Sequence, residues 1–298
     1  MGVADIFGKT FQILRKNPRI VVPYLLFTFL VGGVVLYTVF SGLGNLYGSG
    51  IFGLRGIAHA NLSAGLPAVI QFFTGLLTVM VLLGVFSLIV TPFLLGTYIN
   101  IADQGYGKGI VAFNKAFKVA RDNYSRLLGI ELLLAVIWII VLVVLAAIFA
   151  SPIIFFGANL ASGIWLVIGM GVGIAVSVLL GILFYEAYTV AVLENRDVAD
   201  AIRRSISIGK MNLARIFTIF LITAAILIVY ITIITILQVL LETGLAGFGS
   251  LFVGATIAQV VNYMLSSGLA VWMALIPVGF YKEYVRSAER KIAKGKAH

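Results

Sequence analysis

The stretch Phe113–Leu128, with the sequence FNKAFKVARDNYSRLL, decides the fold because it joins a short basic amphipathic segment to a long apolar run. The same kind of joint occurs at Phe7–Ile20 (FGKTFQILRKNPRI) and at Ile202–Ile216 (IRRSISIGKMNLARI). Apolar residues on one helical face and basic residues on the other are typical of a helix that lies in a membrane interface. The pattern therefore predicts three basic amphipathic interfacial helices, each leading into a membrane span.

The three joints share a register as well as a composition. Aligned on Phe11, Phe117 and Ile206, each has an Asn six positions later and an Arg within three residues of that Asn. The asparagines are Asn17, Asn123 and Asn212. This register predicts three repeats of interfacial helix, span, outer loop and span, all with the same orientation. The alternative is that basic joints are common to helical membrane proteins and imply no repeat.

The composition indicates a membrane protein. Of the 298 residues 61% are hydrophobic and 11% are charged, whereas soluble domains carry about 25% charged residues. Six apolar runs are long enough to cross a hydrocarbon layer of about 30 Å. The predicted spans are about 20–40, 67–101, 127–150, 163–193, 216–241 and 250–281, with a break at Ser151–Pro152 after the third. We expect an all-α integral membrane protein with six transmembrane helices and a single domain, 1–298, with repeat units of about 1–105, 106–195 and 196–298.

The charge predicts the topology. The net charge is +10, and all but one of the 21 Lys and Arg residues lie in segments on the same side of the predicted spans. The exception is Arg55. Positive residues are enriched in cytoplasmic loops, so both termini are expected in the cytoplasm of a multi-pass cell-membrane protein. Attraction to anionic lipid accounts for this charge, and no nucleic-acid partner is expected.

Motifs for enzyme chemistry are scarce. The chain has no cysteine, no HExxH, no GxSxG and no phosphate-binding loop. His59 and the terminal His298 are the two histidines, and both lie outside the predicted spans. We therefore expect no cofactor and no metal, and the sequence leans against an enzyme.

Glu131 and Glu186 form the candidate intramembrane ionisable site. Both belong to the middle unit, on consecutive spans and in the predicted cytoplasmic half. An ionisable group at such depth is costly and usually faces a partner or a water-filled cavity. If the two acids face one another, they suit proton binding. The structural alternative is that they pair with Arg126, Arg215 or another basic residue.

Two polar stripes at helical spacing form a candidate polar path in the fifth and sixth spans. The residues are Thr232, Thr235, Gln238, Thr256, Gln259, Asn262 and Ser266. Hydrogen bonds between helices are the alternative use of such stripes.

The basic segments supply candidate contacts with lipid headgroups or with a partner. These residues are Arg19, Lys115, Lys118, Arg126, Arg203, Arg204 and Arg215. Anionic headgroups on the cytoplasmic side are the expected ligands, and a protein partner or a second copy of the chain is the further expectation.

The motifs N-P-R-I at Asn17–Ile20, N-x-x-R-I at Asn212–Ile216 and P-x-x-x-G-x-Y at Pro92–Tyr98 carry a family resemblance. Together with Phe113–Arg126, they resemble the uncharacterised six-span bacterial and archaeal membrane families related to the membrane domain of glycerophosphodiester phosphodiesterases. The resemblance implies a plasma-membrane protein. It implies no phosphodiesterase activity, because a separate catalytic domain and a metal-binding His/Glu set are missing from the sequence.

The sequence thus favours a non-enzymatic membrane protein that organises lipid or a partner through a basic cytoplasmic face. The alternative is a transporter or channel for protons, ions or a small solute that uses Glu131, Glu186 and the polar stripes.

Overall fold

The structure is a computed structural model that describes residues 2–48, 62–108, 111–157, 160–246 and 251–289. All regular secondary structure in these residues is helical, and six segments are long and apolar enough to cross a membrane. These two features confirm the predicted helical class and the predicted number of spans. The spans are formed by α2 (Val22–Gly48), α3 (Leu62–Lys108), α5 (Tyr124–Phe156), α6 (Leu160–Phe184), α9 (Leu213–Ala246) and α10 (Leu251–Phe280). Residues 49–61, 158–159 and 247–250 of the predicted outer loops, and residues 290–298 at the basic C-terminal end, lie outside the described residues.

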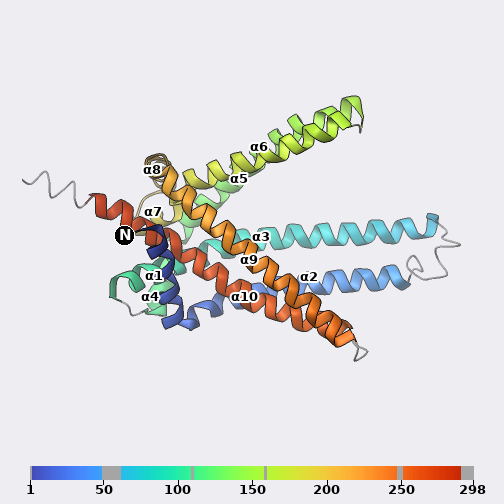
Figure 1. Cartoon of the computed structure of the whole chain (residues 1–298), viewed down its shortest axis with the longest axis horizontal. Helices are drawn as coiled ribbons and strands as arrows, with labels where there is room; N and C mark the ends of the chain where they lie inside the picture. Colours follow the sequence, from blue (N-terminus) through green and yellow to red (C-terminus); the bar gives the residue numbers. More distant parts are fainter. Residues whose placement is uncertain (1, 49–61, 109–110, 158–159, 247–250, 290–298) are drawn as a thin grey trace, which may run out of the picture.

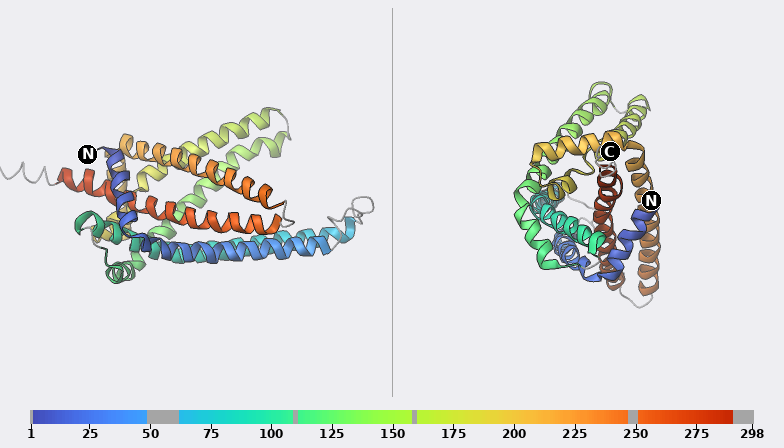
Figure 2. Two further views of the ribbon diagram at one scale, coloured as in Figure 1. Left: turned by 60° about the horizontal axis from the view of Figure 1, so that its bottom comes forward. Right: turned by 90° about the vertical axis from the view of Figure 1, so that its left-hand side faces the viewer.

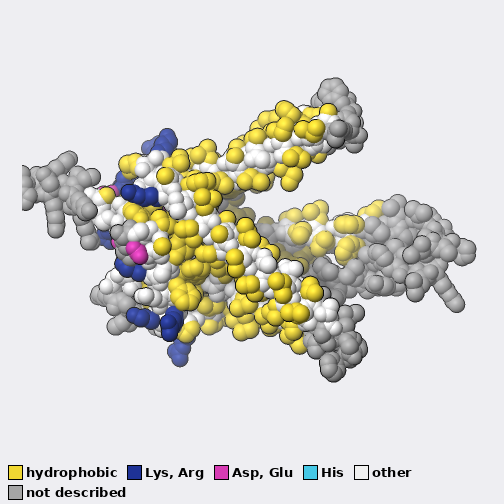
Figure 3. Space-filling model, viewed as in Figure 1, with side chains coloured by type: hydrophobic (Ala, Val, Ile, Leu, Met, Phe, Trp, Pro, Cys, Tyr) yellow, Lys and Arg dark blue, Asp and Glu magenta, His cyan; other side chains and the backbone are white. Residues whose placement is uncertain are grey.

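The long helices form three hairpins that diverge from a common end of the molecule, which we call the base (Figure 1). α2 packs against α3, α5 against α6, and α9 against α10. α10 also contacts α2 and α3, so it lies between hairpins. Away from the base the spans expose large apolar side chains, as helices that face lipid do (Figure 3). The fully buried core, including Leu127, Ile208 and Phe280, lies at the base.

Three short helices, α1 (Val3–Lys16), α4 (Phe113–Asp122) and α8 (Val198–Met211), form much of the base. Figure 2 shows α1 lying across the ends of the spans. Each helix ends at an Asn whose side-chain amide donates to the carbonyl four residues earlier, at 3.1 Å for Asn17, 2.9 Å for Asn123 and 3.1 Å for Asn212. The same carbonyl also accepts from the backbone N–H of the Asn, so the side chain adds a second hydrogen bond at the end of each helix. The shared Asn in the sequence therefore has the same local role three times.

The short helices pack against the spans in a cyclic order. α4 packs on α3 and α8 on α6, in each case the preceding long helix, while α1 packs on α10, the last one. The short helices approach the spans closely where a glycine lies in the contact. A side chain at Gly96 would meet Ala120, and one at Gly279 would meet Ile6. Gly209 lies against the α6 backbone, where an added Cβ would be 2.8 Å from the Ile182 carbonyl oxygen.

The contact between α1 and α10 is partly polar. The Trp272 indole donates to the Thr10 hydroxyl at 3.0 Å and to the Phe7 carbonyl at 3.3 Å. Ile6 and Thr10 are fully buried, whereas Phe11, the position on which the joints align, is 53% exposed and forms a T-shaped ring contact with Trp272. The face of α1 that packs on α10 is therefore the buried one. Ile13 is also buried and extends this face toward the end of the helix.

The predicted break at Ser151–Pro152 is wrong, because α5 continues through Pro152 to Phe156. Proline lacks an N–H, which leaves the carbonyl four residues earlier without its helical donor. That carbonyl belongs to Ile148, and it accepts from the Ser151 hydroxyl at 2.8 Å and from the Trp165 indole at 3.3 Å. These two donors replace the missing hydrogen bond, so the helix persists.

Candidate functional site

Glu186 lies at a turn that interrupts the fourth predicted span, between α6 and α7 (Ala187–Leu193). The Ser205 hydroxyl of α8 bridges this turn, since it donates to the Leu183 carbonyl at 2.9 Å and accepts from the Glu186 N–H at 3.2 Å. A polar partner outside the helix thus satisfies backbone groups that the interruption exposes. The sequence predicts one continuous span over about 163–193, without the turn at Glu186.

The Glu186 side chain is buried in the base. The residue is 1% exposed, and neither carboxylate oxygen has a hydrogen-bond partner among the described residues. The Thr189 hydroxyl lies close to it without the geometry of a hydrogen bond. Buried polar groups are almost always paired, so an unpartnered carboxyl is a candidate site for a proton, a cation or a water molecule.

The structure does not bring Glu131 and Glu186 together as a pair. Glu131 accepts a hydrogen bond from the hydroxyl of Tyr188, on α7. Neither acid forms the predicted ion pair with Arg126 or Arg215. Arg126 contacts Asp197 at 3.7 Å, and the guanidinium of Arg215 lies 4.7 Å from the centre of the Tyr284 ring.

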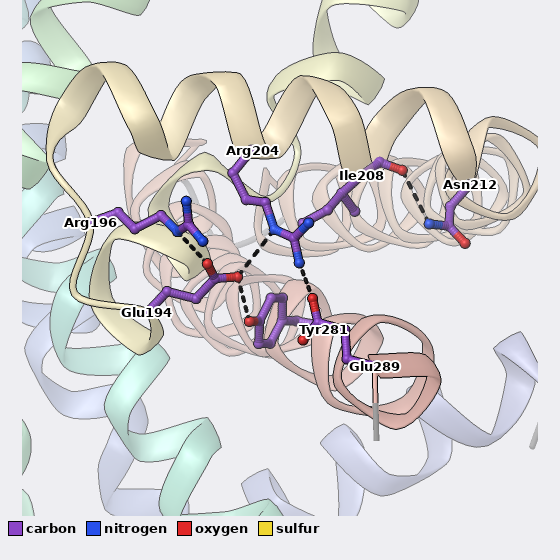
Figure 4. A network of polar contacts seen from close by, with 7 residues as sticks. All are labelled: Glu194, Arg196, Arg204, Ile208, Asn212, Tyr281 and Glu289. Carbon is purple, nitrogen blue, oxygen red and sulfur yellow. Dashed lines mark hydrogen bonds and ion pairs between the residues drawn. The ribbon is translucent and has the colours of Figure 1, made fainter. Parts of the chain in front are cut away.

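A polar network ties α7 and α8 to the end of α10 (Figure 4). Glu194 accepts from the Tyr281 hydroxyl at 2.7 Å and contacts Arg196 and Arg204, and Arg204 also contacts Glu289. Partial burial by itself raises the pKa of Glu194. The hydrogen bonds from Tyr281 and Arg196 and the positive charges of Arg204 and Arg196 outweigh that effect, so the pKa of this carboxyl is lowered.

Two more ion pairs connect the same end of α10 to other helices. The ammonium of Lys282 lies 2.7 Å from the carboxylate of Asp103 on α3, and that of Lys9 on α1 lies 3.0 Å from Glu283. The π-helical segment Tyr281–Arg286 that follows α10 is therefore linked to three parts of the base. Because these acids form ion pairs within the base, cations predominate among the remaining charged side chains there.

The predicted headgroup contacts fall into two groups. Arg19, Lys115 and Lys118 are exposed and form no ion pair among the described residues, and Arg203 is exposed beside Asp200 at 4.0 Å. Of the other predicted contacts, Arg126 and Arg204 are half-buried and form ion pairs within the base, whereas Arg215 is exposed and lies over the Tyr284 ring. The structure thus separates cations that hold the fold from cations presented to the surroundings.

The residues of the predicted polar path differ in exposure and in hydrogen-bond partners. Thr232, Thr235 and Gln238 are exposed, and the two threonine hydroxyls bond to carbonyls of their own helix. Asn262 accepts from the Tyr230 hydroxyl of α9 at 2.7 Å. Ser266 donates to its own helix, and Gln259 is half-buried. The side chain of Thr256 lies outside the described residues. A path along these residues stays a prediction.

Two surface cavities open at the base. One of about 430 Å³ lies between α3 and α4 and is lined by Phe93, Asn114, Phe117, Lys118 and Arg121. The other, of about 210 Å³, lies between α1 and α3, and Lys9, Lys16 and Tyr106 are among its lining residues. Each has cations in its wall.

Sequence reasoning missed Ser205 and Glu194. A signal for Ser205 exists, because it occupies the same register position as Thr10 and Ala116, and all three are buried. For Glu194 the sequence carries no comparable signal, since its partners Arg204 and Tyr281 come from distant segments.

Comparison with known proteins adds a family. No match was found among curated proteins or among solved structures. A family model described as a domain of unknown function, DUF7847, matches residues 1–284. Since the match extends over nearly the whole chain, the protein belongs to this family.

Proposed function

We propose that this chain is a non-enzymatic multi-pass protein of the cell membrane that organises anionic lipid through its base. The observation that carries the proposal is the distribution of charge. Cations gather at the base (Figure 3), while Asp103, Glu194 and Glu283 of the same region are bound in internal ion pairs. A basic surface at the end of apolar spans suits the anionic headgroups of the cytoplasmic leaflet.

The proposal includes the topology and the repeat. With both termini in the cytoplasm, α1, α4 and α8 are interfacial helices of three parallel units. The three equivalent Asn caps and the cyclic packing of the short helices on the spans support this arrangement. A protein partner or a second copy at the base, and the relationship to phosphodiesterase membrane domains, stay predictions.

Lipid recovery tests the proposed function. The protein is extracted in polymer-bounded native discs, and the lipids that surround it are compared with the bulk membrane. We expect enrichment of anionic over zwitterionic lipid. Replacement of the exposed cations Arg19, Lys115, Arg203 and Lys210 by Gln is expected to reduce the enrichment. Wild-type protein with the bulk lipid composition contradicts the proposal.

Transport of a proton or a cation is the second candidate function. It is favoured by one observation, the buried and unpartnered carboxyl of Glu186 beneath the diverging hairpins. An isolated charge in such a place is costly, so a bound proton or cation stabilises it.

Flux measurements in proteoliposomes test this second function. Proton or cation flux that is present in the wild type and lost in Glu186→Gln supports it, provided that the variant keeps its melting temperature. Asp200→Asn, at an exposed acid of the base, is the control. Flux that is unchanged in Glu186→Gln removes this carboxyl from the mechanism.

A further inference from the structure

The cavity between α3 and α4 has an aromatic floor and a cationic rim. Phe93 of α3 and Phe117 of α4 stack with ring centres 5.7 Å apart and planes 19° apart. Asn114, Lys118 and Arg121 complete the lining. Because Lys118 and Arg121 are three residues apart on a helix, they project from the same face. The cavity thus combines an apolar surface with two positive charges and an amide.

The two cations are available to a ligand. Lys118 is exposed and has no acidic partner among the described residues. Arg121 contacts the neighbouring Asp122 at 3.7 Å, and both side chains are largely exposed. An exposed pair of this kind is weak, so Arg121 can exchange its partner for a phosphate.

The aromatic floor continues onto the apolar surface of a span. Ile89 and Val85 lie one and two turns before Phe93 on α3, and both are about half exposed. This face runs from the cavity away from the base, along the part of α3 that is apolar enough to lie in a membrane. An acyl chain on this face would leave its headgroup beside Lys118 and Arg121.

The other two short helices lack this combination. The positions equivalent to Lys118 and Arg121 are Gln12 and Arg15 in α1, and Ser207 and Lys210 in α8. Each therefore has one cation where α4 has two. In α1 the aromatic neighbour of Phe11 is Trp272, but its indole N–H is already bound to Thr10. The cavity at α4 is thus the best equipped of the three positions.

We propose that the cavity between α3 and α4 binds one anionic phospholipid. Lys118 and Arg121 hold its phosphate, Asn114 bonds to the polar headgroup, and Phe93, Ile89 and Val85 contact an acyl chain. The inference rests on the proposed function, because it assumes that the base lies at the membrane surface, and it narrows that function to one defined site.

Native mass spectrometry of the detergent-solubilised full chain tests the site. The probes are dioleoyl phosphatidylglycerol and dioleoyl phosphatidylcholine, which share their acyl chains. We expect the wild type to bind its first phosphatidylglycerol more tightly than phosphatidylcholine. The variant Lys118→Gln/Arg121→Gln is expected to lose about fivefold in this affinity per cation, or about 25-fold in total, with little change for phosphatidylcholine.

Matched controls separate the site from general attraction. Arg15→Gln/Arg286→Gln removes the same charge from exposed positions outside the cavity, so the first phosphatidylglycerol should bind as in the wild type. Phe117→Ala should weaken both lipids, because it removes the floor. Glycerol 3-phosphate, which has the phosphate without the chains, should not displace the lipid at equal concentration. Melting temperatures establish that each variant is folded.

The outcomes distinguish this inference from the proposed function. Equal losses in the two double variants show diffuse attraction, which overturns the site and leaves the proposed function standing. Displacement by glycerol 3-phosphate at equal concentration overturns the acyl-chain contact, and with it the phospholipid. A wild type without preference for phosphatidylglycerol contradicts both the site and the proposed function.

Discussion

At the scale of single residues, Ser205 holds the turn that carries Glu186. Its hydroxyl bonds to both the Leu183 carbonyl and the Glu186 N–H in a buried setting. Ser205→Ala leaves these backbone groups without their partner, so we expect a loss of about 1–3 kcal/mol in the free energy of unfolding. Thermal unfolding in detergent measures it. Ser207→Ala, at an exposed position of the same helix, is the control, and equal effects of the two substitutions contradict the assigned role.

Glu194 gives the base a dependence on pH. Its pKa in the folded protein lies below the ordinary value of 4.5. The stability that it contributes is therefore complete above the pKa of the unfolded chain and is lost as the pH falls through the lowered value. We expect the melting temperature to drop on acidification from about pH 6 to about pH 3, and the drop to be smaller in Glu194→Gln. Asp200→Asn, at an exposed acid, should retain the wild-type profile.

At the scale of elements, the close contact of α8 with α6 depends on Gly209. An added Cβ there would lie 2.8 Å from the Ile182 carbonyl oxygen and 3.0 Å from the Leu183 Cα, and these backbone atoms cannot turn away. We expect Gly209→Ala to push the helices apart and to destabilise the protein by about 1–3 kcal/mol. Gly8→Ala in α1 meets no atom within 4 Å. It should be neutral or stabilising by up to about 1 kcal/mol, since Ala favours a helix over Gly. Unfolding curves that shift in the same direction would refute this contact.

At the scale of the whole molecule, the distribution of charge predicts the orientation in the membrane. The chain has no cysteine, so an introduced thiol is the single target of a maleimide. In intact cells a membrane-impermeant maleimide should label Thr243→Cys and Ala161→Cys, at the far ends of hairpins, and should miss Lys115→Cys and Lys210→Cys. The latter two should react after permeabilisation. Labelling of Lys115→Cys in intact cells would contradict the proposed topology.

The sequence by itself determined the number of long apolar helices and the places where short helices precede them. Hydropathy and helical spacing are local properties, and the run of apolar residues that a bilayer requires can be read without knowing its neighbours. The Asn at the end of each joint is equally local, because its side chain bonds to a carbonyl four residues earlier in α1, α4 and α8 alike.

The tertiary structure decided which charged residues meet. Glu131 was expected near Glu186 or an arginine, yet it accepts a hydrogen bond from Tyr188, and Arg204 was expected at the surface, yet it binds Glu194 and Glu289. The continuation of α5 through Pro152 depends in the same way on Trp165 of the next helix. Spacing within one helix cannot reveal such contacts, because they depend on how separate helices cross at the base. Those crossings are set by the close approach of small residues such as Gly96, Gly209 and Gly279.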